Sequence, residues 1–386
     1  MRKKAVVFIS FMIIMIVMGA SDSLRGIFAV MFREHFELSA FQISLIITVS
    51  YLGNLIFLFF GGAFVDRYHK KKALLAIVSI WLCGAALFIF TDDYVLLLLG
   101  MFFCMGASTL INTTINILVP AVFAASPGMI VNILFFVQGI GTSTSQNFGG
   151  KLTGNYSSWQ GINLFLAVLA VVGAVFLLTA DIPEVRQEGR KKISYKGILK
   201  APIFWSLTLI FGFYFIAEHG ILNWLLLYGI NELGLSSGHA SAYLSLFFGG
   251  ITLGRLLFAP VVQKLGVKKS ITLFGGVGTV GYITGILSGK TGIMLLSLSG
   301  LGISILYPTL VLMIRLFYEE DRIATATGAV ISLATIFDIV FNMAFGKLVD
   351  SYGLRISIMI LPFSMAAFYI SYLIFVGSKK KKVCSE

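Results

Sequence analysis

The sequence predicts an all-α membrane protein with twelve transmembrane helices in two pseudo-symmetric six-helix bundles. Three observations support this class. The 386 residues are 58% hydrophobic and only 12% charged, about half of the roughly 25% charge of soluble domains. The apolar residues form long continuous runs, and the basic residues form short clusters between these runs. So few charges cannot cover a particle of this size in water, and lipid is therefore expected to cover most of its surface.

Each expected span is an apolar run long enough to cross the hydrocarbon core, which requires about 20 helical residues. The continuous runs favour helices, because strands of a membrane barrel alternate in hydropathy over about ten residues. The first run is too long for a signal peptide and lacks a clear cleavage site, so it is counted as a span. The spans are expected at 5–32, 40–65, 72–90, 94–118, 128–155, 159–180, 202–231, 238–263, 270–288, 291–317, 323–348 and 354–377.

One long polar stretch, 181–201, divides the spans into six and six. We expect residues 1–180 to form an N-terminal six-helix bundle and 202–386 to form a C-terminal bundle with a basic cytoplasmic tail. The stretch between them is expected to be a cytoplasmic linker.

The basic residues predict the orientation. If both termini lie on one face, that face carries 22 of the 29 Lys and Arg residues and the other face carries 5, with Arg25 and Arg255 inside spans. Basic loops stay in the cytoplasm. The sequence therefore predicts a multi-pass protein of the cell membrane with both termini cytoplasmic.

A shift of 196 residues brings matching features of the two halves together. Asp22 maps onto Glu218 in this way, and a Gly-Lys-Leu-x3-Tyr pattern recurs. Two parallel six-helix halves with a substrate site near the membrane midplane form one known transporter architecture. The recurring pattern comprises Gly150, Lys151, Leu152 and Tyr156 in the first half and Gly346, Lys347, Leu348 and Tyr352 in the second.

Ionisable residues inside spans are costly and mark functional positions. We expect Glu218, Asp22 and Asp338 to couple transport to protons, since burial adjusts the proton affinity of a carboxylate. Asp22 and Arg25, three residues apart, share one helix face and can alternatively form a structural ion pair. Arg255 is expected to serve packing or gating.

His219 neighbours Glu218 in the chain and therefore points elsewhere. We expect it to make a hydrogen bond between packed helices.

Amide and aromatic side chains in the spans suit a polyhydroxylated substrate, because amides both donate and accept hydrogen bonds and rings stack on the apolar faces of sugars. Amides also hold membrane helices together, which is the alternative interpretation. The expected substrate-binding residues are Asn112, Asn116, Gln138, Trp224, Asn342 and Tyr307. Tyr307-Pro308 also predicts a kink in the tenth span.

The segment after the second span, Gly62-Ala63-Phe64-Val65-Asp66-Arg67-Tyr68-His69-Lys70-Lys71, resembles the G-x-x-x-D-R-x-x-[KR]-[KR] motif of the major facilitator superfamily. A degenerate copy follows the eighth span at 260–269. The resemblance implies that Gly62, Asp66 and Arg67 belong to a gate that braces the two halves on the cytoplasmic side and favours the outward-open state.

Two further segments resemble the fucose/glucose-type sugar:proton symporters of that superfamily. Residues 216–219, Ile-Ala-Glu-His, with Asn-Trp-Leu at 223–225, are similar to their seventh span. Asn112 to Asn116 is similar to their E-T-x-x-N motif, but Asn112 stands where those symporters have an acid. Any proton coupling in this chain must therefore use another acid.

These observations predict a secondary active transporter that moves a small polar solute, with a sugar as the expected class, by proton-coupled alternating access. No phosphate-binding loop points to ATP, no Cys/His cluster points to a metal or cofactor, and no soluble domain is large enough for an enzyme. The expected partners are the solute, protons and the lipid bilayer, with no nucleic acid, and the protein is expected to be a monomer. The alternatives are a proton-antiport exporter of drugs or metabolites, and a non-transporting membrane sensor.

Overall fold

The computed structural model describes residues 2–125, 127–180, 182, 195–318 and 320–383, and their regular structure is helical. The chain divides into two compact units. Unit 1 comprises Met1–Gly189 with Ser237–Ser245, and unit 2 comprises Arg190–Ser236 with Leu246–Glu386.

Unit 1 is built from the first seven helices, several of which begin at side chains that cap them. Ser39 and Gln42 form a reciprocal capping box at the start of the second long helix, and Asp93 and Asn155 each accept a hydrogen bond from a backbone N–H of the first turn. Such caps satisfy N–H groups that the helix itself leaves unpaired. The helices are α1 (Arg2–Ile27), α2 (Ala29–His35), α3 (Ala40–Arg67), α4 (Lys70–Phe90), α5 (Tyr94–Val122), α6 (Pro127–Gly149) and α7 (Tyr156–Thr179).

Unit 2 contains the remaining helices, although the first nine residues of α10 belong to unit 1, where Ser237 Oγ donates to the Gly150 carbonyl over 2.8 Å. The helices are α8 (Tyr195–Lys200), α9 (Pro202–Asn231), α10 (Ser237–Leu265), α11 (Val267–Leu287), a 3-10 turn (Gly289–Thr291), α12 (Ile293–Ile303), α13 (Leu306–Arg315), α14 (Glu320–Tyr352), α15 (Leu354–Ser357) and α16 (Ile360–Val383).

Within the described residues, eleven helical segments are long and apolar enough to cross a membrane. The other expected span, 128–155, corresponds to α6, which ends at Gly149. Three spans are interrupted, at Phe28, at Ser304–Ile305 and at Ile358–Met359. The interruption at Ser304–Ile305 precedes Pro308 and confirms the expected kink, because proline removes a hydrogen bond from the helix.

The two units repeat one packing pattern, in agreement with the 196-residue repeat. In unit 1, α1 packs against α6 and α7, and α4 packs against α5 and α7. In unit 2, α9 packs against α14 and α16, and α11 packs against α12 and α16. The two units therefore share one helical arrangement, as the expected pair of pseudo-symmetric bundles requires.

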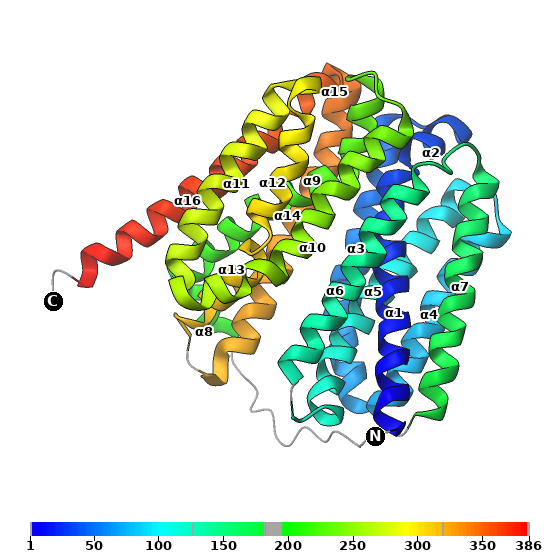
Figure 1. The fold of residues 1–386 in the computed structure, drawn as a ribbon, viewed down its shortest axis with the longest axis horizontal. Coiled ribbons are helices and arrows are strands. Elements are labelled where there is room, and N and C mark those ends of the chain that lie inside the picture. Colours follow the sequence, from blue (N-terminus) through cyan, green and yellow to red (C-terminus); the bar gives the residue numbers. More distant parts are fainter. Residues whose placement is uncertain (1, 126, 181, 183–194, 319, 384–386) are drawn as a thin grey trace. The chain divides into compact units, whose positions relative to one another are not determined.

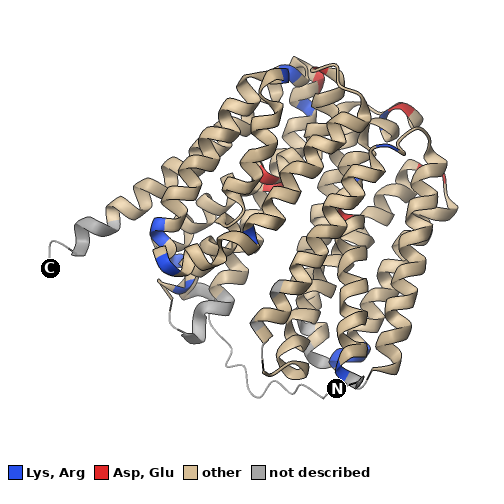
Figure 2. Ribbon diagram, viewed as in Figure 1, with Lys and Arg blue, Asp and Glu red and all other residues tan. Residues whose placement is uncertain are grey.

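The loops at the two ends of the unit 1 helices make contacts that fit helices running alternately in opposite directions. On one face, Lys71 Nζ donates to the carbonyls of Leu178 and Ala180 at the end of α7, over 2.9 and 2.6 Å. On the other face, His35 Nε2 lies 2.6 Å from Asp92 Oδ1, and its ring stacks on Tyr156. Figure 2 shows that most of the described charged residues in each unit gather near the ends of helices, with few in the middle.

A glycine allows α3 and α5 to cross closely. A Cβ atom on Gly53 would lie 3.0 Å from the carbonyl carbon of Phe102, and closer still to its oxygen. Backbone atoms cannot rotate away from such a contact, so this crossing requires glycine at position 53.

Three residues of the predicted gate cannot be evaluated in this way. The backbones of Gly62, Asp66 and Arg67 belong to α3, but their side chains lie outside the part of the structure that is described.

Candidate functional site

Asp22 and Arg25 on α1 both face α5. Ser108 Oγ donates to Asp22 Oδ2 over 2.8 Å, and Arg25 Nη1 lies 3.1 Å from Met105 Sδ. The Arg25 guanidinium carbon also lies 4.8 Å from the centre of the Tyr51 ring, a cation–π distance. The i, i+3 pair on α1 therefore shares one face, as expected, and its contacts reach residues 105 and 108, which are also one turn apart on α5.

From this contact onward along the chain, α5 carries a line of polar side chains. Ser108, Asn112 and Asn116 follow one another at intervals of four residues and so occupy one side of the helix. Among the described residues, nothing forms a hydrogen bond with the buried oxygens Asp22 Oδ1, Asn112 Oδ1 and Asn116 Oδ1. An unsatisfied buried polar atom costs about 1–3 kcal/mol. Three such oxygens, on Asp22 and on one side of α5, therefore mark this part of unit 1 as a candidate site for a polar ligand.

Gln138 lies on α6, where this helix approaches α1 closely. A Cβ atom on Gly19 would touch the Gln138 backbone and side-chain Cγ, and Thr142 Oγ1 donates to the Gly19 carbonyl over 3.1 Å. Ser23 Oγ lies 2.6 Å from Ser145 Oγ in the same interface. The half-buried Gln138 therefore flanks the helix that carries Asp22, and hydroxyl groups fasten the two helices.

In unit 2, Asp338 on α14 pairs with His219 on α9. The His219 Nδ1 to Asp338 Oδ2 distance is 2.7 Å. The Asp338 side chain is 1% exposed and that of His219 is 27% exposed, so the pair is buried on the acidic side only. The expected helix-packing hydrogen bond of His219 is confirmed, and its acceptor is one of the three expected coupling acids.

Trp224 and Asn342 extend this pair into a chain of hydrogen bonds. Trp224 Nε1 donates to Asn342 Oδ1 over 3.1 Å, and Asn342 Nδ2 donates to the Asp338 carbonyl over 2.8 Å. Both side chains are fully buried, and the Trp224 ring packs against Phe345. The polar atoms of both side chains are therefore paired within unit 2, with each other and with the Asp338 backbone carbonyl.

Glu218 lies on another side of α9, among tyrosines. It is 8% exposed and close enough to Tyr214, Tyr282 and Tyr307 to interact electrostatically with each of them. Tyr282 Oη donates to the Ala217 carbonyl over 2.7 Å. A buried acid surrounded by phenol groups can exchange a proton and can also receive hydrogen bonds from a polar ligand.

Arg255 on α10 reaches the break between α12 and α13. Its Nε donates to the Ser304 carbonyl over 3.4 Å. In an uninterrupted helix that carbonyl would accept from the N–H of residue 308, but Pro308 has none. Arg255 also interacts electrostatically with Tyr214 and Tyr307, so one side chain connects the helix break to the Glu218 cluster.

The structure thus gathers the predicted residues into separate groups. In unit 1, Asp22 contacts Ser108 on the side of α5 that also carries Asn112 and Asn116, and Gln138 lies on α6, which packs against α1. In unit 2, Asp338, Asn342 and Trp224 form one group, and Glu218, Tyr307 and Arg255 form another. Sequence reasoning did not identify Ser108, Tyr214 or Tyr282. Ser108 stands one turn before Asn112, and that spacing was a usable indication.

No group of three or more His, Cys, Asp or Glu side chains able to hold a metal ion occurs within the described residues.

Comparison with curated proteins finds transporters. The chain is 24% identical over 392 residues to a putative glucose/galactose transporter of Helicobacter pylori (strain J99), with 95% of this chain and 94% of that protein covered. A protein of the same name from H. pylori strain 26695 is 24% identical over 221 residues, and this match spans only 54% of its length. The 2-nitroimidazole transporter of Escherichia coli is 23% identical over 259 residues, with 64% of each chain covered.

Solved structures share the fold. The E. coli fucose:proton symporter matches with a TM-score of 0.69 and 17% identity, covering 95% of this chain and 98% of the symporter. A bacterial homologue of the human lysosomal transporter Spinster matches with a TM-score of 0.76 and 13% identity, covering 97% and 98%. At these identities the likeness concerns the fold alone.

A family model described as the Major Facilitator Superfamily matches residues 7–335, which is most of the chain. The match agrees with the repeated helical units and with the Asp-Arg segment after the second span. The chain is a multi-pass membrane transporter of small molecules, not an enzyme, and it belongs to the Major Facilitator Superfamily.

Proposed function

We propose that the protein imports a sugar, or a closely similar polyhydroxylated solute, together with protons. One observation carries the proposal: Asp22, Asn112 and Asn116 present buried oxygens to which no described residue donates a hydrogen bond. A solute rich in hydroxyl groups supplies the missing donors, whereas an apolar drug would leave these oxygens unsatisfied. The name of the H. pylori relatives that match this chain supports the same substrate class.

In this proposal, Asn112, Asn116 and Gln138 bind hydroxyl groups from unit 1. Tyr307, half-buried beside the rings of Phe211 and Phe215, stacks on an apolar sugar face. Trp224 and Asn342 contribute by joining α9 to α14 beside Asp338, because their own polar atoms are already paired, with each other and with the Asp338 backbone carbonyl.

Proton coupling is assigned to Glu218, Asp22 and Asp338. Each is an acid within a span, and each contacts groups that respond to its charge: a hydroxyl for Asp22, tyrosines for Glu218 and an imidazole for Asp338. Arg255 is assigned to gating through the helix break at Pro308, and Gly62, Asp66 and Arg67 to the gate that the family motif implies. We further propose that the protein works by alternating access as a monomer in the cell membrane, with both termini cytoplasmic.

The test is uptake of radiolabelled glucose, galactose and fucose into proteoliposomes, with and without an imposed pH gradient that is acidic outside. The wild type is expected to concentrate at least one sugar only when the gradient is present. Glu218→Gln is expected to abolish concentrative uptake while retaining exchange of sugar between the two sides, because exchange requires no net proton transfer.

Glu232→Gln is the matched control, since Glu232 is exposed just after α9, and it should behave like the wild type. Failure of every sugar to accumulate would contradict the proposal. Expulsion of hydrophobic dyes against a pH gradient, unaffected by sugars, would indicate a proton-antiport exporter instead. Absence of any flux would indicate a sensor.

A further inference from the structure

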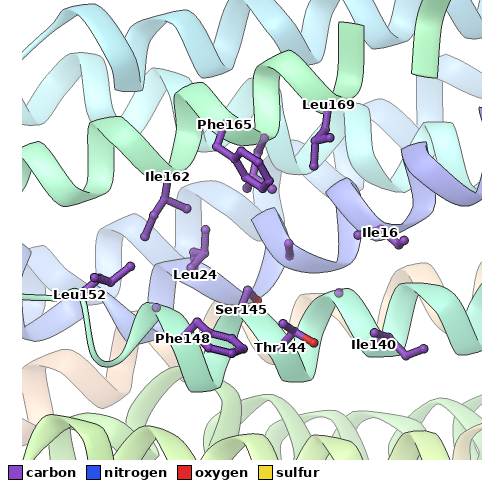
Figure 3. Close-up of a pocket in the computed structure, with 14 residues that line it drawn as sticks. Ile16, Leu24, Ile140, Thr144, Ser145, Phe148, Leu152, Ile162, Phe165 and Leu169 are labelled. Carbon is purple, nitrogen blue, oxygen red and sulfur yellow. The ribbon is translucent and has the colours of Figure 1, made fainter. Parts of the chain in front are cut away.

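An apolar groove in unit 1 lies outside the polar site. It has a volume of about 410 Å³. Ile16 and Leu24 of α1 lie at its base, and Figure 3 shows Phe165 of α7 and Phe148 of α6 on its two sides. Leu152, just beyond the end of α6, closes one end.

The lining cannot hold a polar solute. Its exposed surface is apolar, and its two hydroxyl groups belong to Thr144 and Ser145, the second of which is bonded to Ser23. Phe148 is 60% exposed and Phe165 is 63% exposed. Large apolar side chains that stay exposed on membrane-spanning helices are in contact with lipid hydrocarbon.

The length of the groove indicates what kind of molecule can occupy it. The lining extends along α6 from residue 140 to its end at Gly149, about 14 Å at 1.5 Å per residue, which is close to the roughly 15 Å depth of one leaflet. An extended hydrocarbon chain that enters from one leaflet matches this length and the apolar lining.

A cation marks the end of the groove where a headgroup would lie. Lys151 is exposed, and its Nζ lies 5.6 Å from the centre of the Phe148 ring, which is part of the groove wall. A lysine at the membrane surface attracts anionic lipid with about 1 kcal/mol. The sequence therefore places a positive charge at the mouth of a hydrocarbon slot that is one leaflet deep.

We propose that this groove binds one anionic phospholipid from the leaflet on the Lys151 side, with an acyl chain between α6 and α7 and the phosphate at Lys151. The bound chain fills space between two helices that both pack on α1. Because α1 also carries Asp22, the lipid supports the helix that bears part of the polar site.

Native mass spectrometry tests the proposal on the full chain, released from nanodiscs that contain equal amounts of phosphatidylglycerol and phosphatidylethanolamine. The wild type is expected to retain one phosphatidylglycerol. Thr144→Phe and Leu169→Trp fill the groove from opposite walls and should each remove that adduct; the two variants guard against misfolding of one of them. Lys151→Gln should weaken retention about fivefold, the equivalent of one lysine contact.

Lys290→Gln is the charge-matched control, since Lys290 is exposed in unit 2, and it should retain phosphatidylglycerol as the wild type does. Equal retention in the wild type and in a correctly folded groove-filling variant would overturn the proposal. Equal retention of the two lipids by the wild type would overturn it as well.

Discussion

Asp338 is bonded through two different groups: its carboxylate lies 2.7 Å from His219 Nδ1, and its backbone carbonyl accepts from Asn342, whose Oδ1 in turn accepts from Trp224. A buried carboxylate that loses its partner is costly, whereas a neutral amide of the same shape is tolerated better. The contribution of His219 to stability therefore depends on the presence of Asp338, and the contribution of Asp338 depends on the presence of His219.

A double-mutant cycle measures this dependence. His219→Ala alone is expected to lower the free energy of unfolding by about 1–3 kcal/mol, because it leaves the buried acid without an imidazole. In an Asp338→Asn background the same change should cost less, with an interaction energy of about 0.5–3 kcal/mol. Thermal unfolding in detergent provides the measurement. Additive effects of the two changes would refute the pairing.

Asn112 illustrates the opposite situation, an amide whose oxygen has no donor among the described residues. Asn112→Leu should therefore leave thermal stability nearly unchanged and reduce sugar uptake at least about tenfold, since a lost polar contact is worth about 1.4 kcal/mol or more. Asn163→Leu serves for comparison, because the Nδ2 group of that buried amide on α7 donates to the Trp159 carbonyl, while its Oδ1, like that of Asn112, has no donor among the described residues. It should lower stability and spare the KM for sugar. A loss of stability without a loss of uptake at Asn112 would assign it to packing.

At the scale of helices, the break between α12 and α13 depends on two residues that are far apart in the chain. Pro308 removes the hydrogen bond to the Ser304 carbonyl, and Arg255 provides a replacement. The break is thus maintained by a side chain from a neighbouring helix, and its geometry is tied to the position of α10.

Substitution of both residues separates their roles. Arg255→Ala should lower stability by about 1–3 kcal/mol, because the Ser304 carbonyl loses its donor. With Pro308→Ala present, the new backbone N–H can bond to that carbonyl, and the loss of Arg255 should cost less. Uptake is expected to fall in both single variants. The idea fails if Arg255→Ala is equally costly with and without the proline.

The close crossing of α3 and α5 makes a second prediction for helices. Gly53→Ala places a methyl group against the Phe102 backbone and should lower stability by about 1–3 kcal/mol, as overpacking does. Gly161→Ala provides a control, because nothing lies within 4 Å of a Cβ there. That change should be neutral or stabilising by up to about 1 kcal/mol, as for any glycine inside a helix. Chemical or thermal unfolding of the two variants gives the comparison.

At the scale of the whole molecule, alternating access requires that water reaches the polar residues from each side of the membrane in turn. In a background without native cysteines, Asp22→Cys, Asn112→Cys and Glu218→Cys should react with membrane-impermeant thiol reagents applied from either face, and sugar should slow the reaction. Cysteine at Leu164, an exposed apolar position on α7, should stay unreactive because it faces lipid. Uniform protection of the first three positions in folded protein would exclude a water-filled pathway.

The sequence predicted what depends on local pattern. Long apolar runs located the spans, and the Tyr307-Pro308 pair located a break, because hydrocarbon and proline each act on a short segment. Trp224 and Asn342 are 118 positions apart in the chain. Their mutual hydrogen bond depends on how two helices pack, and local pattern therefore did not predict it. Both amides and aromatics were correctly placed in spans, but whether such a group binds a ligand or a neighbouring helix depends on packing that a single sequence does not contain.

Lys71 has a consequence for the order of assembly. Its ammonium group closes the end of α7 by donating to the carbonyls of Leu178 and Ala180. Since α4 leaves the ribosome more than 100 residues before those carbonyls, the first bundle can be completed while the second is still being translated. Lys71→Glu would then leave the last carbonyls of α7 without this donor when the first bundle closes.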